Sequence, residues 1–108
     1  MDFDKIVENR CEQVKKVLCK KAEEYAPNTN RFHNFDVAAR RLNCTPEAAL
    51  RGMMEKHAVS VDDMISNPDT ATEYLIDEKI GDFISYLILL EGLFLRRIDN
   101  SEKFIGQS

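Results

Sequence analysis

The sequence has little of what builds a disulfide framework, a membrane span or a secretory signal. It contains three cysteines, an odd number without a C-x-x-C pair, which argues against a disulfide framework or a zinc knuckle and favours a reducing compartment. The longest apolar stretch, Phe83 to Leu95, spans 13 residues and contains Glu91. It is too short to cross a bilayer, which needs about 20 residues. The first residues lack the basic start and apolar run of a signal peptide. We therefore expect a cytoplasmic protein with no membrane partner.

Basic residues are also fewer than acidic ones: the chain has 15 Lys and Arg and 19 Asp and Glu, which gives a net charge of −4. Duplex nucleic acid is therefore not an expected partner. The sequence has no P-loop, no GxGxxG and no Ser/His/Asp order, which disfavours triad hydrolases and the common nucleotide folds. What remains is the composition of a globular chain, with 44% hydrophobic residues in a length of 108. We expect one domain over residues 1–98 and a flexible tail over 99–108.

Apolar residues recur at steps of three and four along four stretches, which predicts four amphipathic helices. The helices are expected over residues 4–25, 31–42, from the N-cap Thr45 and Pro46 through Met64, and 72–98. The inward positions of the first two helices are Val7, Cys11, Val14, Leu18, Ala22 and Tyr25, then Phe32, Phe35, Ala39 and Leu42. Those of the last two are Leu50, Met53, Met54, His57, Val61 and Met64, then Ile76, Ile80, Phe83, Ile84, Leu87, Leu90 and Phe94. All three cysteines fit as small core residues.

The predicted fold class is all-α, a compact four-helix bundle. Its last helix is apolar on nearly every side from Tyr86 to Leu95. A helix of this kind is buried on more than one side, and in a chain this small we expect a second subunit to supply part of that burial. We therefore expect a homo-oligomer that assembles through the C-terminal helix.

An acidic segment, Asp77 to Asp82, opens that last helix. Glu78 and Asp82 are four residues apart, so their carboxylates lie on one face, where like charges are mildly destabilising. Gly81 adds a helix-propensity cost of about 1 kcal/mol relative to Ala. Together these costs indicate either a site or a close helix contact, and Mg²⁺ is the natural ion between carboxylates and phosphates. The alternative is a solvated first turn that the helix dipole favours.

A second polar group lies in the third helix, where Glu55, Lys56 and His57 precede Ser60 and Asp63. His57 falls on the apolar side and is either a histidine at the margin of the core or a ligand. The carboxylates by themselves are typical of a solvated face. Acidic residues on two helices, however, are also how bundle-core metal sites are built.

A third group comes after the first helix. Tyr25, Arg31, His33 and Asn34 offer an aromatic face, a phosphate partner and an amide, which together suit a nucleotide. In the alternative interpretation Arg31 is solvated and Asn34 caps a helix.

The order of these groups resembles a family of small phage and prophage proteins associated with nucleotide modification. The resemblance covers roughly residues 18–95 and is carried by KAEEY…NRFHNF…EKH..S..D…DEKIGDFISYLILLEGL. The matching positions are Lys21, Glu24, Tyr25, Arg31, Asn34, Phe35, Lys56, His57, Ser60, Asp63, Glu78, Asp82, Tyr86, Leu89 and Leu90.

That family is in turn similar to the all-α, MazG-like nucleoside triphosphate pyrophosphohydrolases, which bind magnesium and work as dimers or tetramers. The resemblance implies a Mg²⁺ site on Glu55, Asp63, Glu78 and Asp82. It implies candidate catalytic residues Glu55, Lys56 and His57, and nucleotide contacts from Lys21, Tyr25, Arg31, Asn34 and Lys56. The chain lacks the E-E-x-x-E of those enzymes and has E-x-x-x-D in place of E-x-x-D.

Three functions therefore compete. The first is a Mg²⁺-dependent pyrophosphohydrolase acting on a nucleoside triphosphate. The second is a module that binds a nucleotide without turnover. The third is a helical interaction protein whose apolar last helix docks a partner or a second copy.

Overall fold

The computed structural model describes residues 1–20 and 30–107, and this part of the chain is helical with no strand, so the all-α prediction is confirmed. Helix α1 (Phe3–Lys15) runs into a π-helical turn, η1 (Lys16–Lys20). Helices α3 (His33–Leu42) and α4 (Pro46–Ser66) come next, then a 3₁₀ turn, η2 (Pro68–Thr70). The last rod consists of α5 (Glu73–Leu75), the π-helical turn η3 (Ile76–Ile80) and α6 (Gly81–Gln107).

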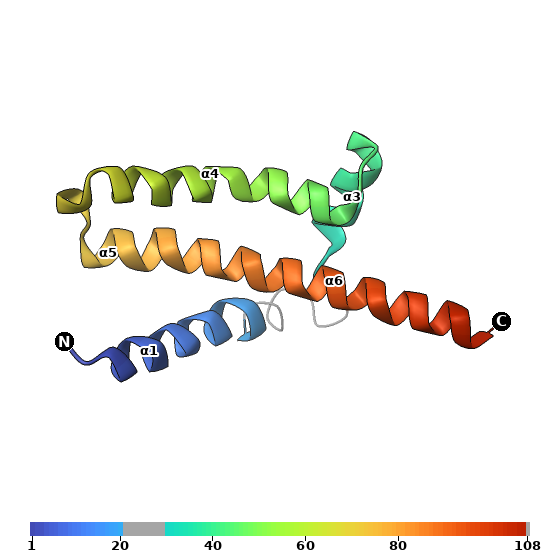
Figure 1. Ribbon diagram of the computed structural model, residues 1–108, viewed down its shortest axis with the longest axis horizontal. Coiled ribbons are helices and arrows are strands. Elements are labelled where there is room, and N and C mark those ends of the chain that lie inside the picture. Colours follow the sequence, from blue (N-terminus) through green and yellow to red (C-terminus); the bar gives the residue numbers. More distant parts are fainter. Residues whose placement is uncertain (21–29, 108) are drawn as a thin grey trace.

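The rod α5–η3–α6 lies antiparallel to α4, and α1 runs along its other side (Figure 1). Short α3 crosses the end of α4, and the C-terminal part of α6 projects beyond both (Figure 1). The chain measures 56 × 28 × 26 Å. Its radius of gyration is 16.7 Å, against about 13 Å for a compact domain of this length. The bundle is therefore elongated rather than compact.

Local signals set the helix starts. The hydroxyl of Thr45 accepts a hydrogen bond from the Ala48 amide at 3.1 Å, with Pro46 at the first helical position, as the sequence predicted. The hydroxyl of Thr72 caps α5 in the same way through the Leu75 amide, also at 3.1 Å. Asn43 ends α3 in the left-handed conformation, with φ 55°.

The core sits where α3, α4 and α6 meet. Phe35, Leu50, Met54 and Leu93 form its buried centre, and Phe32, Tyr86 and other partly buried side chains pack around them. Two arginines of α6 reinforce this junction. Arg96 makes a two-pronged contact with Asp36 of α3, and Arg97 makes one with Glu47 of α4. These contacts fix which side of α6 faces the rest of the chain.

Several expected core positions prove to be exposed. Helix α1 has no buried residue, and its predicted inward residues Val7 and Cys11 are solvent-exposed, because in the described part of the chain it packs mainly against α6 alone. The prediction of three core cysteines is wrong, since Cys11, Cys19 and Cys44 are all exposed. Outside α1 the other exposed positions are Leu42, Ile76, Leu87 and Phe94. Ala22 and Tyr25 lie outside the described residues.

The fourth predicted helix differs from the structure at two points. It is interrupted by the π-helical turn η3, and its helical backbone continues through residues 99–107, where the sequence suggested a tail. Within the described residues, no helix has the length and apolarity to cross a membrane.

Candidate functional site

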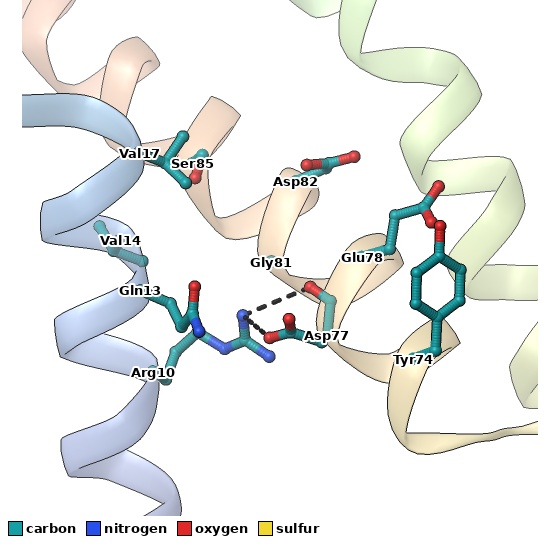
Figure 2. A pocket seen from close by; sticks show the side chains of 10 residues that line it. All are labelled: Arg10, Gln13, Val14, Val17, Tyr74, Asp77, Glu78, Gly81, Asp82 and Ser85. Atoms are coloured by element: carbon teal, nitrogen blue, oxygen red, sulfur yellow. Dashed lines mark hydrogen bonds and ion pairs between the residues drawn. The ribbon is translucent and has the colours of Figure 1, made fainter. Parts of the chain in front are cut away.

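A pocket of about 390 Å³ lies between α1 and the start of α6 (Figure 2). It combines carboxylates, one guanidinium and two valines. The lining residues are Arg10, Gln13, Val14, Val17, Tyr74, Asp77, Glu78, Gly81, Asp82 and Ser85. Two of the lining residues, Asp77 and Glu78, come from η3, and π-helical turns inside longer helices are frequent at functional sites.

Arg10 joins the two walls of the pocket. Its Nη1 lies 3.2 Å from the Asp77 carboxylate and donates to the Asp77 backbone oxygen at 3.4 Å, as Figure 2 shows. The guanidinium occupies the space beside Gly81, where a Cβ would stand only 2.6 Å from Nη1. Gly81 thus lies both at a close contact with the Arg10 side chain of α1 and in the lining of the pocket, the two interpretations that the sequence left open.

Glu78 points away from Arg10, and its carboxylate lies beside the Tyr74 hydroxyl (Figure 2). This hydroxyl, together with the ammonium of Lys79 at 3.3 Å, lowers the pKa of Glu78 below its usual value. The same carboxylate raises the pKa of Tyr74. Glu78 is therefore ionised at neutral pH, and part of its hydrogen-bonding capacity is already used.

Asp82 lies one helical turn further on and faces α4, which is the third of the helices predicted from the sequence. Its Oδ2 is 3.8 Å from Nδ1 of His57, and the His57 ring lies 4.8 Å from that of Tyr86. The His57 side chain is only 14% exposed. The structure therefore places His57 at the margin of the core, and it brings this histidine close to Asp82, one of the three pocket carboxylates.

The other candidate catalytic and metal residues lie elsewhere. Glu55 and Asp63 are exposed on α4, and neither lines the pocket; Glu55 pairs with Arg51 at 2.7 Å. Lys56 is exposed too. Over residues 1–20 and 30–107, no three His, Cys, Asp or Glu side chains form a group able to hold a metal ion. The residues described therefore do not fit a four-carboxylate magnesium site within one chain.

Among the described residues, the expected nucleotide contacts do not line the pocket either. Arg31 and Asn34 are exposed at the start of α3 and do not line the pocket. Asn34 does not cap α3; the Asn30 carboxamide oxygen instead accepts from the Phe32 amide at 2.9 Å. Lys21 and Tyr25 lie outside the described residues.

Sequence reasoning missed Arg10, Tyr74 and Ser85 as lining residues. One signal was present, because Arg10 lies three residues after Val7 and four before Val14, within the apolar stripe of its helix. A charged residue in such a stripe indicates a partner on the neighbouring element.

Comparison with known proteins gives no match to any family model, curated protein or solved structure. The resemblance to nucleotide-processing proteins therefore stays a prediction from the sequence.

Proposed function

We propose that this chain is a self-associating helical protein that docks a second copy through one face of α6. The observation that carries the proposal is a set of large apolar side chains, each between 39% and 55% exposed. With 3.6 residues per turn, they share one side of the helix about 120° wide. We call this set the α6 apolar face; it consists of Leu87, Ile88, Phe94, Leu95 and Ile98.

The described part of the chain leaves this face uncovered. Helices α3 and α4 pack on the side of α6 that carries Leu93, Arg96 and Arg97. Helix α1 packs beside Gly81 and Ser85. Exposed apolar side chains gathered on one side of a helix mark an interaction site in soluble proteins.

The total surface favours a second copy as the occupant. The chain exposes 8420 Å², whereas a compact monomer of 12.4 kDa exposes about 6100 Å². The excess of about 2300 Å² lies within the roughly 1000–2500 Å² that each partner buries in obligate homodimers. A twofold contact between identical faces is also closed, because it leaves neither copy of the α6 apolar face free for further growth.

Sedimentation velocity over a range of concentrations tests this proposal. The wild-type chain is expected to sediment as a dimer at micromolar concentration. Leu95→Asp should weaken association at least 100-fold, because it buries two carboxylates in the contact. Leu42→Asp is the matched control, since Leu42 is the same residue type and is also exposed, at 68% against 55% for Leu95, but lies on α3. A monomeric wild type, or equal effects of the two variants, would contradict the proposal.

Binding of a magnesium–nucleotide complex is the second candidate. It is favoured by Glu78 and Asp82, which line one pocket with Arg10. With three carboxylates and one guanidinium in its lining, this pocket would repel a free phosphate and accept one only with its bound cation. This role needs no turnover, and the expected pyrophosphohydrolase activity stays a separate prediction.

Calorimetry with Mg²⁺ and a panel of nucleoside triphosphates tests the second candidate. The double variant Glu78→Gln, Asp82→Asn should lose binding, whereas Glu55→Gln, outside the pocket, should keep it. Absence of heat with every nucleotide would remove the nucleotide role. Release of pyrophosphate in the same mixtures would support the hydrolase prediction.

A further inference from the structure

We infer, building on the proposed self-association, that the two α6 helices pair antiparallel, with the twofold axis crossing the α6 apolar face at the level of residues 92 and 93 along the helix. The observation behind this inference is Glu91, an exposed carboxylate in the middle of the α6 apolar face. Arg96 and Arg97 are turned toward α3 and α4, where Asp36 and Glu47 hold them. Glu91 makes none of the ion pairs found in the described part of the chain.

Two identical helices can pair about a twofold axis in two ways. If the axis is parallel to the helices, every residue faces its own copy, and Glu91 meets the Glu91 of the partner at the centre of an apolar contact. Like charges repel strongly there, because the dielectric is low and neither carboxylate has a counter-charge. The parallel arrangement is therefore disfavoured by the residue at its centre.

If the axis is perpendicular to the helices, each residue faces a different position. The α6 apolar face extends from Leu87 to Ile98, so an axis at its midpoint brings Leu87 of one chain against Ile98 of the other. Glu91 then lies against Phe94 of the partner. With a rise of 1.5 Å per residue, the two Glu91 residues are offset by about 4.5 Å along the helix axes. Because side chains lean toward the N-terminus of their own helix, the two carboxylates then diverge from each other and can turn toward water. This arrangement buries every apolar residue of the face without pairing like charges, and it opposes the two helix dipoles.

Cysteine cross-linking distinguishes the two arrangements. The native cysteines are exposed and none lies on α6, so Cys11→Ser, Cys19→Ser and Cys44→Ser provide the background. Leu87→Cys and Ile98→Cys are made in separate chains that carry tags of different mass. The chains are oxidised alone and as an equilibrated mixture, and the disulfide-linked products are separated by size. Sedimentation of each reduced sample records whether it is a dimer.

If the helices pair antiparallel, the yield of the mixed disulfide between positions 87 and 98 should exceed that of either disulfide between identical positions at least tenfold. Position 87 lies about 16 Å along the axis from its own copy in this arrangement, which is beyond the reach of a disulfide. Predominant 87–87 and 98–98 products, or a dimer that forms neither kind, would overturn the orientation and leave self-association standing. A reduced background that sediments as a monomer would instead overturn the self-association itself.

Discussion

At the scale of single residues, three glycines inside helices have different surroundings. A Cβ at Gly52 would meet no atom within 4 Å. At Gly92 it would stand 2.8 Å from Cζ of the Phe32 ring, and at Gly81 it would meet only the flexible end of Arg10. The Phe32 ring cannot retreat freely, because it packs on the core and Arg96 lies over it at 5.1 Å. Gly92 is thus required by packing, whereas Gly52 is not.

We therefore expect Gly52→Ala and Gly92→Ala to change stability in opposite directions. Gly52→Ala should raise the free energy of unfolding by about 1 kcal/mol, the difference in helix propensity. Gly92→Ala gains the same propensity but displaces Phe32, and overpacking costs about 1–3 kcal/mol, so the net change should be a loss of up to about 2 kcal/mol. Urea unfolding at one fixed protein concentration measures both. A stabilising Gly92→Ala would mean that the ring moves aside without cost.

Among the described residues, the Asp36 carboxylate accepts the largest number of side-chain hydrogen bonds. It accepts from Arg96 at 2.8 and 3.1 Å and from the Asn30 side chain at 3.0 Å. The hydrogen bonds from Arg96 are the main reason that the pKa of Asp36 lies below its ordinary value of 3.8. The pKa of Glu47 is lowered from 4.5 in the same way, chiefly by its hydrogen bonds from Arg97.

These lowered pKa values predict the acid dependence of stability. A carboxyl whose pKa is lower in the folded chain stabilises the fold above its unfolded pKa, and this stabilisation is lost as the pH falls through the folded pKa. Stability should therefore be level above about pH 5.5 and decline below about pH 4.5. Asp36→Asn should cost about 1 kcal/mol at pH 7 and make the decline shallower. Glu55→Gln, in an exposed pair, should cost only a few tenths of a kcal/mol. Urea unfolding at each pH measures the free energy of unfolding of both proteins. If this free energy falls as steeply with decreasing pH in Asp36→Asn as in the wild type, the assignment is contradicted.

At the scale of elements, the small core depends on α4. Leu50 is fully buried and contacts the cluster to which both α3 and α6 contribute. Leu50→Ala should therefore lower the free energy of unfolding by about 3–5 kcal/mol, the upper range for a core leucine, because few other apolar residues are buried. Val59→Ala on the same helix is the control, since Val59 is exposed. Comparable urea midpoints for the two variants would show that the core lies elsewhere.

Helix positions were predictable because the spacing of apolar residues and the caps are local signals. Thr45 and Pro46 fixed the start of α4, and the inward positions Leu50 and Met54 of that helix are buried. Burial in α1 was not predictable in this way, because periodicity identifies an apolar side without saying whether anything covers it. The π-helical turn η3 was also missed, since no propensity signal marks one extra residue per turn.

At the scale of the whole molecule, stability should depend on protein concentration. If folding and association are coupled, a hundredfold dilution removes about 2.7 kcal/mol of apparent stability. For a dimer of this size, the corresponding fall in Tm is about 6 °C. Differential scanning calorimetry or circular dichroism at several concentrations measures this shift. A Tm that stays constant across the dilution series would argue for a monomer that is stable by itself.

The candidate site was predictable only in part. Glu78 and Asp82 were expected together because residues four apart share a helix face, and both line the pocket. Glu55 and Asp63 were grouped with them by resemblance, but contacts between helices depend on how α4 is rotated about its axis. The apolar stripe around Arg10 indicates that this residue has a partner, but the identity of that partner depends on the docking of a helix far away in the sequence, which no local pattern specifies.

The π-helical turn η3 also affects how mutations along the last rod should be interpreted. A single additional residue in one turn shifts the angular phase of α5 by about 100° relative to α6. A heptad register that starts at Thr72 will therefore assign the wrong side to positions beyond Gly81. Removing Lys79 would rotate Tyr74 and Glu78 by about 100° around the rod relative to Asp82, while leaving the α6 apolar face intact. The length of this short segment can therefore disrupt the acidic pocket without changing the α6 apolar face.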